Sequence, residues 1–270
     1  MKLKFSKMQA AGNDFIIIDN RNKRIKTGYG KLAKKLCARK FSVGADGLIL
    51  VENSGNADFR MVYFNSDGSP AGMCGNGARC VAYYSYLHCI SNRFLALETS
   101  AGIIKAKITG KRVKIDMPAL GDVRQDIKLR VDGKDLDASF INTGVPHTVI
   151  ISKNTGQVDV AGLGKSIRFH TEFQPAGTNV DFVSVVDRHR IKIRTYERGV
   201  EEETYACGTG AVAGAVISGL KNMVVSPVEC GTSGGETLVV YFRKKENGLI
   251  TNVSLAGPVH RVFDGICCDE

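Results

Sequence analysis

The chain has 270 residues, 43% of them hydrophobic, and a formal net charge of +10. This length supports one large core or, as we expect, two cores of about 100–150 residues each, and no apolar run reaches the ~18 residues of a membrane-spanning helix. The basic residues are dispersed along the chain, so we expect no nucleic-acid partner and no membrane partner. The N-terminus alternates charged and apolar residues without the apolar core of a secretion signal, which predicts a cytoplasmic protein with reduced thiols.

The predicted secondary structure mixes a few helices with many short strands. Alternating apolar and polar runs bounded by Gly, Asn and Asp are typical of antiparallel or mixed strands, and apolar residues at helical spacing indicate helices. This mixture predicts the α+β class. In chain order, the expected elements are a helix at 30–39, a strand at 59–64, a helix at 75–89, strands at 103–108 and 113–117, a helix at 158–169, a strand at 191–196, a helix at 208–220 and a strand at 238–242.

Two segments share one signature, Cys-Gly-x-Gly-Ala, at residues 74–78 and 207–211. Each follows a predicted strand and a polar loop, each leads into a predicted helix, and the two cysteines lie 133 residues apart, which is nearly half the chain. This self-similarity predicts duplication of one α+β unit of domain size. We expect an N-terminal domain at 1–118 and a C-terminal domain at 119–270, with residues from about 263 to 270 packing back onto the first domain.

A cysteine at the N-terminus of a helix is suited to proton transfer. Unpaired N–H groups and the helix dipole stabilise anions there, so a thiol pKa can fall from about 8.5 into roughly the 3.5–7.5 range. The same N–H groups, left accessible by the glycines, can hold a carboxylate beside the thiol. Two such cysteines facing one pocket would flank a substrate carbon with an acid and a base. A buried structural thiol and a thiol redox pair remain open at this point.

Metal and nucleotide binding fit the signature less well. Cys74 and Cys80 lack the CxxC spacing of zinc sites, and no matching set of His and Cys residues follows. The glycines match neither GxGxxG after a strand nor a Walker A loop with its Lys and Ser/Thr. We therefore expect no metal and no nucleotide.

Glu197 and Arg198 stand at the end of the predicted strand before the second signature. A carboxylate can hold an ammonium group, and the guanidinium fork suits bidentate recognition of a carboxylate. These two residues are candidates for binding a small amino-acid substrate, and the alternative is an ordinary surface ion pair.

Five motifs, in this order, resemble those of the diaminopimelate epimerase family. They are FSKMQAAGNDFIIID, FNSDGSPAGMCGNGARC, TGVPHTVI, GTNVDFVSV and YERGVEEETYACGTGA, which together span residues 5–211. The resemblance implies two similar domains, each a mostly antiparallel or mixed sheet curled around a central helix, with the active site in the cleft between them. It also implies interconversion of LL- and meso-2,6-diaminopimelate, for lysine and peptidoglycan-precursor biosynthesis, by a homodimer without pyridoxal phosphate, metal or nucleotide.

The resemblance assigns roles to individual residues. It implies that Cys74 and Cys207 are the catalytic pair, one acting as thiolate base and the other as thiol acid. His147, in the motif VPH, and Glu197 match positions that bind substrate nitrogen or adjust the cysteine pKa values. The residues implied in substrate binding are Asn13, Asn65, Asn179, Glu197 and Arg198, together with the backbone N–H groups of Gly75, Asn76, Gly208 and Thr209.

Two positions depart from the pattern of the family. Val145 stands where many members carry Asn, and Gly47 stands where some carry Gln, so neither side chain can hydrogen-bond the substrate. These departures leave open a related cofactor-independent racemase of another amino acid. From a different class, a non-catalytic carboxylate-binding module would use the two helix N-termini without any chemistry at the thiols.

Overall fold

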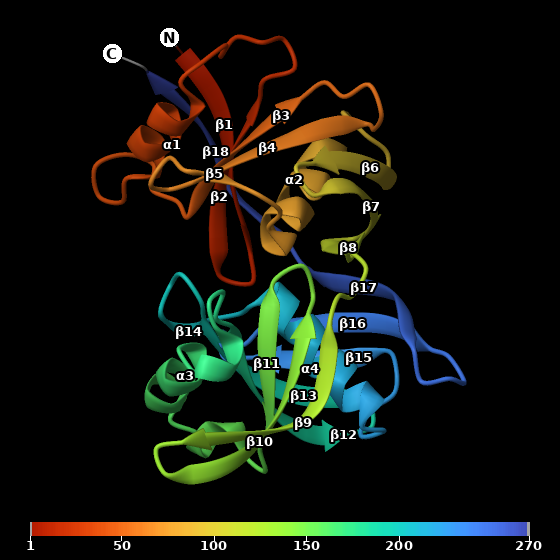
Figure 1. Ribbon diagram of the computed structural model, residues 1–270. Coiled ribbons are helices and arrows are strands. Elements are labelled where there is room, and N and C mark those ends of the chain that lie inside the picture. Colours follow the sequence, from red (N-terminus) through yellow and green to blue (C-terminus); the bar gives the residue numbers. More distant parts are fainter. Residues whose placement is uncertain (1, 269–270) are drawn as a thin grey trace. The chain divides into compact units, whose positions relative to one another are not determined.

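The computed structural model describes residues 2–268, which form two compact units (Figure 1). The first unit holds residues 2–115 and 257–268, and the second holds residues 116–256. The expected boundary after residue 118 is therefore slightly late, and the segment that returns to the first unit begins at residue 257 instead of about 263. The return is longer because β18 (His260–Cys268) pairs over its whole length with β1 (Lys2–Ala10).

The first unit contains one row of paired strands in the order β18, β1, β2, β3, β4, β6, β7, β8. The pairs β2–β3 and β4–β6 are parallel, whereas the other pairs in the row are antiparallel. The short strand β5 pairs with the end of β4. The bounds are Asn13–Asp19 for β2, Gly47–Glu52 for β3, Phe59–Asn65 for β4, Pro70–Ala71 for β5, Phe94–Thr99 for β6, Gly102–Thr109 for β7 and Arg112–Asp116 for β8.

The second unit contains a row in the order β9, β10, β11, β12, β13, β15, β16, β17. Here the pairs β11–β12 and β13–β15 are parallel, and the short strand β14 pairs with the end of β13. The bounds are Val123–Val131 for β9, Lys134–Asn142 for β10, Pro146–Ile151 for β11, Asn179–Asp187 for β12, Arg190–Glu197 for β13, Glu202–Thr204 for β14, Val228–Thr232 for β15, Thr237–Lys244 for β16 and Ile250–Pro258 for β17.

Strand order and strand direction agree between the two units at every step. The strand β18 takes the place in the first unit that β9 takes in the second, and β5 corresponds to β14. The first strand of the row is therefore β18, from the end of the chain, in the first unit. In the second unit it is β9, which directly precedes β10 in sequence. This agreement confirms the α+β class and the duplication of one unit that the repeated signature predicts.

Each unit has one central helix, and both central helices begin at the predicted residue. The helix α2 (Gly75–Leu87) contacts β1, β2, β3 and β7, and α4 (Gly208–Leu220) contacts β10, β11, β12, β13, β15 and β16. Because one helix reaches strands spread along most of its row, the sheet must curl around it. Most residues of α2 and α4 are buried, and their Gly and Ala residues allow close approach of the strands.

The remaining helices, α1 (Tyr29–Cys37) and α3 (Val160–Arg168), cover the outside of the sheets and are buried on one side only. Alternate side chains of β3 show that α1 and α2 lie on opposite faces of the sheet. Leu48 and Leu50 belong to the cluster around α1, whereas Ile49 lies against Gly77 of α2. Two short 3-10 helices, Thr155–Gln157 and Thr171–Phe173, flank α3. Of the helices within residues 2–268, none is both long enough and apolar enough to span a membrane.

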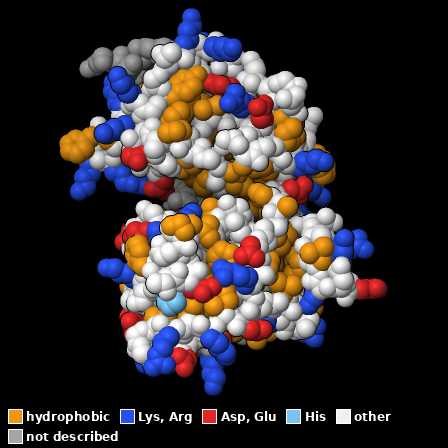
Figure 2. Space-filling view, viewed as in Figure 1, with side chains coloured by type: hydrophobic (Ala, Val, Ile, Leu, Met, Phe, Trp, Pro, Cys, Tyr) orange, Lys and Arg blue, Asp and Glu red, His pale blue; other side chains and the backbone are white. Residues whose placement is uncertain are grey.

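Charged side chains are spread over the face shown in Figure 2, where Lys and Arg occur singly and in small groups on both units. Several Lys and Arg side chains of the protein pair with carboxylates on the same unit, as Arg124 does with Glu172 and Arg190 with Asp187. On this face the positive charge is dispersed, as the sequence predicts.

Candidate active site

Cys74 and Cys207 are the N-cap residues of the two central helices. Their backbone conformations agree closely, with φ and ψ of −117° and 119° at Cys74 and of −114° and 116° at Cys207. The Sγ atom of Cys74 accepts a hydrogen bond from the N–H of Gly77 at 3.5 Å, and that of Cys207 accepts one from the N–H of Gly210 at 3.4 Å. Each sulfur takes the place of the oxygen that usually caps a helix, beside the N–H groups of the first turn.

Near the N-terminus of α2, the predicted site residues Asn13 and Asn76 hydrogen-bond each other. Asn76 Nδ2 donates to Asn13 Oδ1 at 2.6 Å, and Asn76 Oδ1 accepts from Arg79 Nη2 at 2.7 Å. Arg79 is fully buried, and its Nη1 also donates to the carbonyl oxygen of Gly75 at 3.3 Å. A buried guanidinium therefore lies against the first turn of the helix that follows Cys74, and it adds positive charge there.

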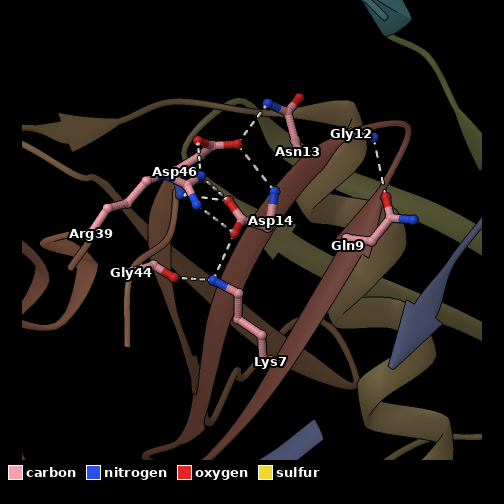
Figure 3. A network of polar contacts seen from close by, with 8 residues as sticks. All are labelled: Lys7, Gln9, Gly12, Asn13, Asp14, Arg39, Gly44 and Asp46. Atoms are coloured by element: carbon pink, nitrogen blue, oxygen red, sulfur yellow. Dashed lines mark hydrogen bonds and ion pairs between the residues drawn. The ribbon is translucent and has the colours of Figure 1, made fainter. Parts of the chain in front are cut away.

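A network of charged residues holds Asn13 from its other side (Figure 3). Asp46 Oδ2 accepts hydrogen bonds at 3.1 Å from Asn13 Nδ2 and at 3.1 Å from the backbone N–H of Asp14. Arg39 bridges the two carboxylates, at 2.6 Å from Asp14 and 2.9 Å from Asp46, and Lys7 lies 2.7 Å from Asp14. Burial raises the pKa of Asp14, but hydrogen bonds from Arg39 and Lys7 outweigh it and lower that pKa below its usual value. This network holds Nδ2 of Asn13 through Asp46, and Asn76 holds Oδ1.

The predicted residue Asn65 lies at the end of β4, where it pairs with Gly47 at the start of β3. Asn65 Nδ2 donates to Ser69 Oγ at 3.0 Å, which holds the side chain to the turn that leads toward Cys74. A Cβ atom at position 47 would lie 2.4 Å from Cε2 of Tyr63, so a glutamine cannot replace Gly47 without displacing that ring. The ring of Tyr63 therefore explains why a glycine stands at this position.

Beside the first turn of α4 lies a buried polar cluster of His147, Asp181 and Thr195. His147 Nδ1 lies 2.7 Å from Asp181 Oδ2, and Thr195 Oγ1 donates to Asp181 Oδ1 at 2.7 Å. The side chains of His147 and Asp181 are both 0% exposed. A Cβ atom at Gly210 would lie 2.4 Å from Asp181 Oδ1, so a glycine in the signature is what lets this carboxylate approach the helix.

The environment of Cys207 favours the protonated thiol. Burial raises the pKa of Cys207 well above its usual value, the carboxylates of Glu197 and Asp181 raise it further, and contacts with Thr209 and the N–H of Gly210 offset this only in part. Burial also raises the pKa of Glu197. The expectation that the helix N-terminus lowers the thiol pKa is therefore wrong for Cys207, because desolvation and two nearby carboxylates outweigh the helix dipole.

Asn179 and Arg198 meet at the end of β13. The N–H of Arg198 donates to Asn179 Oδ1 at 2.8 Å, and Asn179 Nδ2 donates to the carbonyl oxygen of Pro146 at 3.0 Å. The guanidinium of Arg198 donates through Nη1 to the carbonyl oxygen of Ala176 at 2.8 Å. Within residues 2–268, no ion pair joins Arg198 to Glu197, which argues against the surface-pair alternative.

Two residues with direct contacts to the predicted site, Asp46 and Asp181, were not singled out in the sequence. Asp181 stands in a run of apolar β-strand residues, Val180 to Val183, and an acidic residue in such a run indicates a buried, paired carboxylate. Asp46 lies in an ordinary-looking Gly-Ala-Asp-Gly turn, and nothing in the local sequence indicates its bond to Asn13.

The described residues offer acid–base chemistry at two helix N-termini. Within residues 2–268, His, Cys, Asp and Glu side chains form no group of three or more that could hold a metal ion. Each unit carries instead a capping thiol, helix N–H groups and polar side chains close to them. This arrangement suits proton transfer beside a bound carboxylate.

The fold defines a class of proteins built from two copies of one α+β unit. A solved structure of this class, a phenazine biosynthesis protein of the PhzF family from Bacillus anthracis, matches with a TM-score of 0.78 at 17% identity and full coverage of both chains. A hydroxyproline epimerase from Agrobacterium vitis matches with a TM-score of 0.72 at 12% identity, over 98% of this chain and 92% of that one. At these identities the likeness shows the fold alone.

The sequence places the chain in one family of this class. The family profile described as diaminopimelate epimerase matches residues 5–121 and 139–262. Curated relatives with that name include a protein of Aquifex aeolicus, 44% identical over 99% of both chains, and one of Hydrogenobaculum sp., 39% identical over 98% of both. The chain belongs to the diaminopimelate epimerase family, which confirms the resemblance of the sequence motifs.

Proposed function

We propose that this protein interconverts LL- and meso-2,6-diaminopimelate, in lysine biosynthesis, with Cys74 and Cys207 as an acid–base pair. The observation that carries the proposal is the matching pair of N-cap cysteines, which have the same backbone geometry and the same hydrogen bond from the helix to sulfur. Membership of the diaminopimelate epimerase family supports the substrate.

Inversion at Cα needs a base on one face of the carbon and an acid on the other. In the proposed reaction, a thiolate takes the Cα proton, and the electron pair left on carbon is shared with the adjacent carboxylate. The opposite thiol then gives its proton to the other face, so the two sulfurs exchange protonation states in one turnover. Each such proton transfer typically accelerates a reaction by about 10²–10⁴-fold. Both transfers come from the protein, and the reaction needs no cofactor.

We assign the resting proton to Cys207 and the resting thiolate to Cys74. Burial raises the pKa of Cys207, and the carboxylates of Glu197 and Asp181 add to that effect. The Cys74 helix carries the buried Arg79 at its first turn, and a positive charge at that place favours a negative sulfur. The two units therefore share a backbone but differ in charge.

The proximal carboxylate of the substrate is proposed to bind the N–H groups at both helix N-termini, those of Gly75, Asn76, Gly208 and Thr209. Negative charge grows on this carboxylate as the Cα proton leaves, and preorganised N–H donors aimed at developing charge are usually the largest catalytic contribution. Exclusion of water from the site would strengthen these interactions.

Recognition of the distal end is assigned to Asn13, Asn179 and Arg198. Arg198 suits the distal carboxylate, and the amides suit the ammonium group. Val145 offers no hydrogen bond where many relatives carry Asn, and this difference is the specific observation in favour of a racemase for another amino acid. Backbone groups or bridging water can replace such an anchor, so diaminopimelate remains the proposed substrate.

Incubation of the reduced protein with LL-diaminopimelate, followed by chiral chromatography, tests the proposal. We expect the meso isomer to form in wild type and in the Cys89→Ala variant, which loses an exposed cysteine as a matched control. L-glutamate, L-ornithine and L-proline run in parallel test the alternative. Inversion of one of these with none of diaminopimelate would establish another racemase, and inversion of no substrate would point to a binding module.

We also propose that the protein forms a homodimer through β18. This strand pairs with β1 at one end of the strand row of the first unit and exposes three large apolar side chains, those of Val262, Phe263 and Ile266, at 56%, 47% and 59%. Apolar side chains on an end strand favour pairing with another chain. Light scattering should give twice the monomer mass for wild type and the monomer mass for Val262→Glu/Ile266→Glu; a monomeric wild type would contradict the proposal.

A further inference from the structure

The buried cluster of His147, Asp181 and Thr195 has a counterpart in the first unit that contains no carboxylate and no imidazole. The two units can be equated through strand register, because β3 and β12 occupy the same place in their rows. Gly47, the first residue of β3, pairs with Phe15, and Asn179, the first residue of β12, pairs with His147. Two residues further on, Ile49 pairs with Tyr63, and Asp181 pairs with Thr195. The matched positions are Phe15 and His147, Ile49 and Asp181, and Tyr63 and Thr195.

Contacts to the central helices confirm that these positions correspond. A Cβ atom at Gly77 of α2 would lie 3.2 Å from Cδ1 of Ile49, and one at Gly210 of α4 would lie 2.4 Å from Oδ1 of Asp181. Phe15 and Tyr63 pack edge to face, with ring centroids 5.9 Å apart. The first unit thus has the same fold with Phe15, Ile49 and Tyr63 at this place, without a carboxylate or an imidazole.

A buried carboxylate and imidazole are costly in this position. Removing an ionised carboxylate from water costs several kcal/mol unless it is paired and hydrogen-bonded. Both oxygens of Asp181 are satisfied, one by Thr195 and the other by His147, and the N-terminal end of α4 adds a favourable dipole. Since the first unit shows that the fold does not need a carboxylate and an imidazole here, the cluster in the second unit serves the site.

We propose that Asp181 is a positioning residue that fixes the ring orientation and the tautomer of His147. A carboxylate only accepts hydrogen bonds, so the contact at 2.7 Å requires the proton to be on Nδ1 of His147. Thr195 in turn fixes the carboxylate by donating to its other oxygen. His147 Nε2 is buried and has no hydrogen-bond partner within residues 2–268, so it is the ring atom left for the reaction.

The inference rests on the proposed function, in which His147 belongs to the active site. Two ionisable groups interact with the His147 ring, Asp181 on β12 and Glu197 on β13. The same two carboxylates raise the pKa of Cys207 at the start of α4. With Nδ1 held by Asp181, only Nε2 is free to exchange a proton or a hydrogen bond with substrate or with the nearby acids. Loss of Asp181 would release the ring to the other tautomer.

Asp181→Asn tests this role with little change in volume. The NH₂ group of the amide can face His147 and donate to Nδ1, which would move the ring proton to Nε2. We expect kcat/KM to fall about 10–100-fold, as happens when carboxylates that orient metal-binding histidines are removed. The fall should lie in kcat, because Asp181 does not contact substrate. Asp187→Asn, on the same strand in an exposed ion pair with Arg190, is the matched control and should leave the rate unchanged.

Nitrogen-15 NMR of histidine-labelled protein reports the tautomer directly and needs no turnover, so it separates this inference from the proposed function. We expect His147 to carry its proton on Nδ1 in wild type and on Nε2 in Asp181→Asn. A wild-type ring protonated only on Nε2, or an Asp181→Asn variant with unchanged rate, would overturn the inference. If that variant does not fold, Thr195→Val should lower kcat and Thr195→Ser should restore it; equal rates in both would overturn it as well.

Discussion

Replacing Gly210 with alanine should destabilise the protein through a single atom. The new Cβ would lie 2.4 Å from Asp181 Oδ1 and 3.0 Å from Thr195 Oγ1, far inside normal contact distance. The carboxylate cannot move away easily, because hydrogen bonds to His147 and Thr195 hold both of its oxygens. Overpacking of this kind typically costs about 1–3 kcal/mol, and alanine regains about 0.5–1 kcal/mol over glycine within a helix.

The expected net loss for Gly210→Ala is therefore about 1–2 kcal/mol in the free energy of unfolding. For chains of this size, 1 kcal/mol corresponds to roughly 2–4 °C in Tm, so we expect a fall of about 2–8 °C. The duplicated fold offers a matched control in Gly77→Ala, whose Cβ would meet Cδ1 of Ile49 and Cε of Met61, both at 3.2 Å. These are the ends of flexible side chains, so we expect a change of less than about 2 °C.

Differential scanning calorimetry of wild type and the two variants, under reducing conditions at one pH, measures the difference. The prediction is a clear fall in Tm for Gly210→Ala and almost none for Gly77→Ala. Equal effects at the two sites would refute the claim that the carboxylate of Asp181 is locked against the first turn of α4. They would also weaken the argument that the two helix N-termini differ chemically.

Three further predictions concern the site itself. Burial raises the pKa of Glu197 above its usual 4.5, so the stability linked to this group is complete below that unfolded-state value and is lost as pH rises through the folded value. In urea unfolding, Glu197→Gln should therefore gain stability relative to wild type as pH rises from about 4 to 8. A difference in stability that stays constant with pH would count against burial as the cause. Oxidation by diamide, which takes up the two thiol hydrogens, should join Cys74 to Cys207 in a disulfide and abolish activity reversibly. If the peptide map of the inactive protein lacks this disulfide, the proposal that both thiols face the same substrate carbon is contradicted. Arg198→Ala should raise KM for diaminopimelate by about 10–100-fold, since a hydrogen bond to a charged group contributes roughly 1.5–3 kcal/mol. The control is Arg190→Ala, at an exposed arginine. Equal KM values for the two variants would show that Arg198 does not bind the distal end of the substrate.

Much of the fold could be predicted from the sequence because the signals are local. The helices after Cys74 and Cys207 begin where the glycines of the signature end the preceding loop, and alternating patterns marked strands such as 59–64 and 191–196. The duplication was visible because both copies keep the same spacing. The return of β18 to the first unit could not be predicted to its full length, since pairing with β1 depends on contacts between the two ends of the chain.

The candidate site was predicted less completely, because its chemistry depends on burial. Helix position alone suggested a low thiol pKa, but at Cys207 desolvation and two carboxylates from neighbouring strands reverse the direction. Asp46 contacts Asn13 through a loop that is 33 residues away in sequence, and Asp181 reaches His147 across parallel strands. Such contacts follow from strand register and are not encoded by any local pattern.

Solvent-isotope exchange tests the central claim, that Cys74 and Cys207 act on opposite faces of one carbon. Reduced protein is incubated with LL-diaminopimelate in D₂O, and both meso isomer and deuterium at Cα are followed by chiral chromatography and mass spectrometry. We predict that wild type and Cys89→Ala form meso product with deuterium at the inverted Cα, and that Cys74→Ala and Cys207→Ala form none. Full turnover in either single variant, or inversion without any uptake of deuterium in wild type, would contradict the two-thiol mechanism.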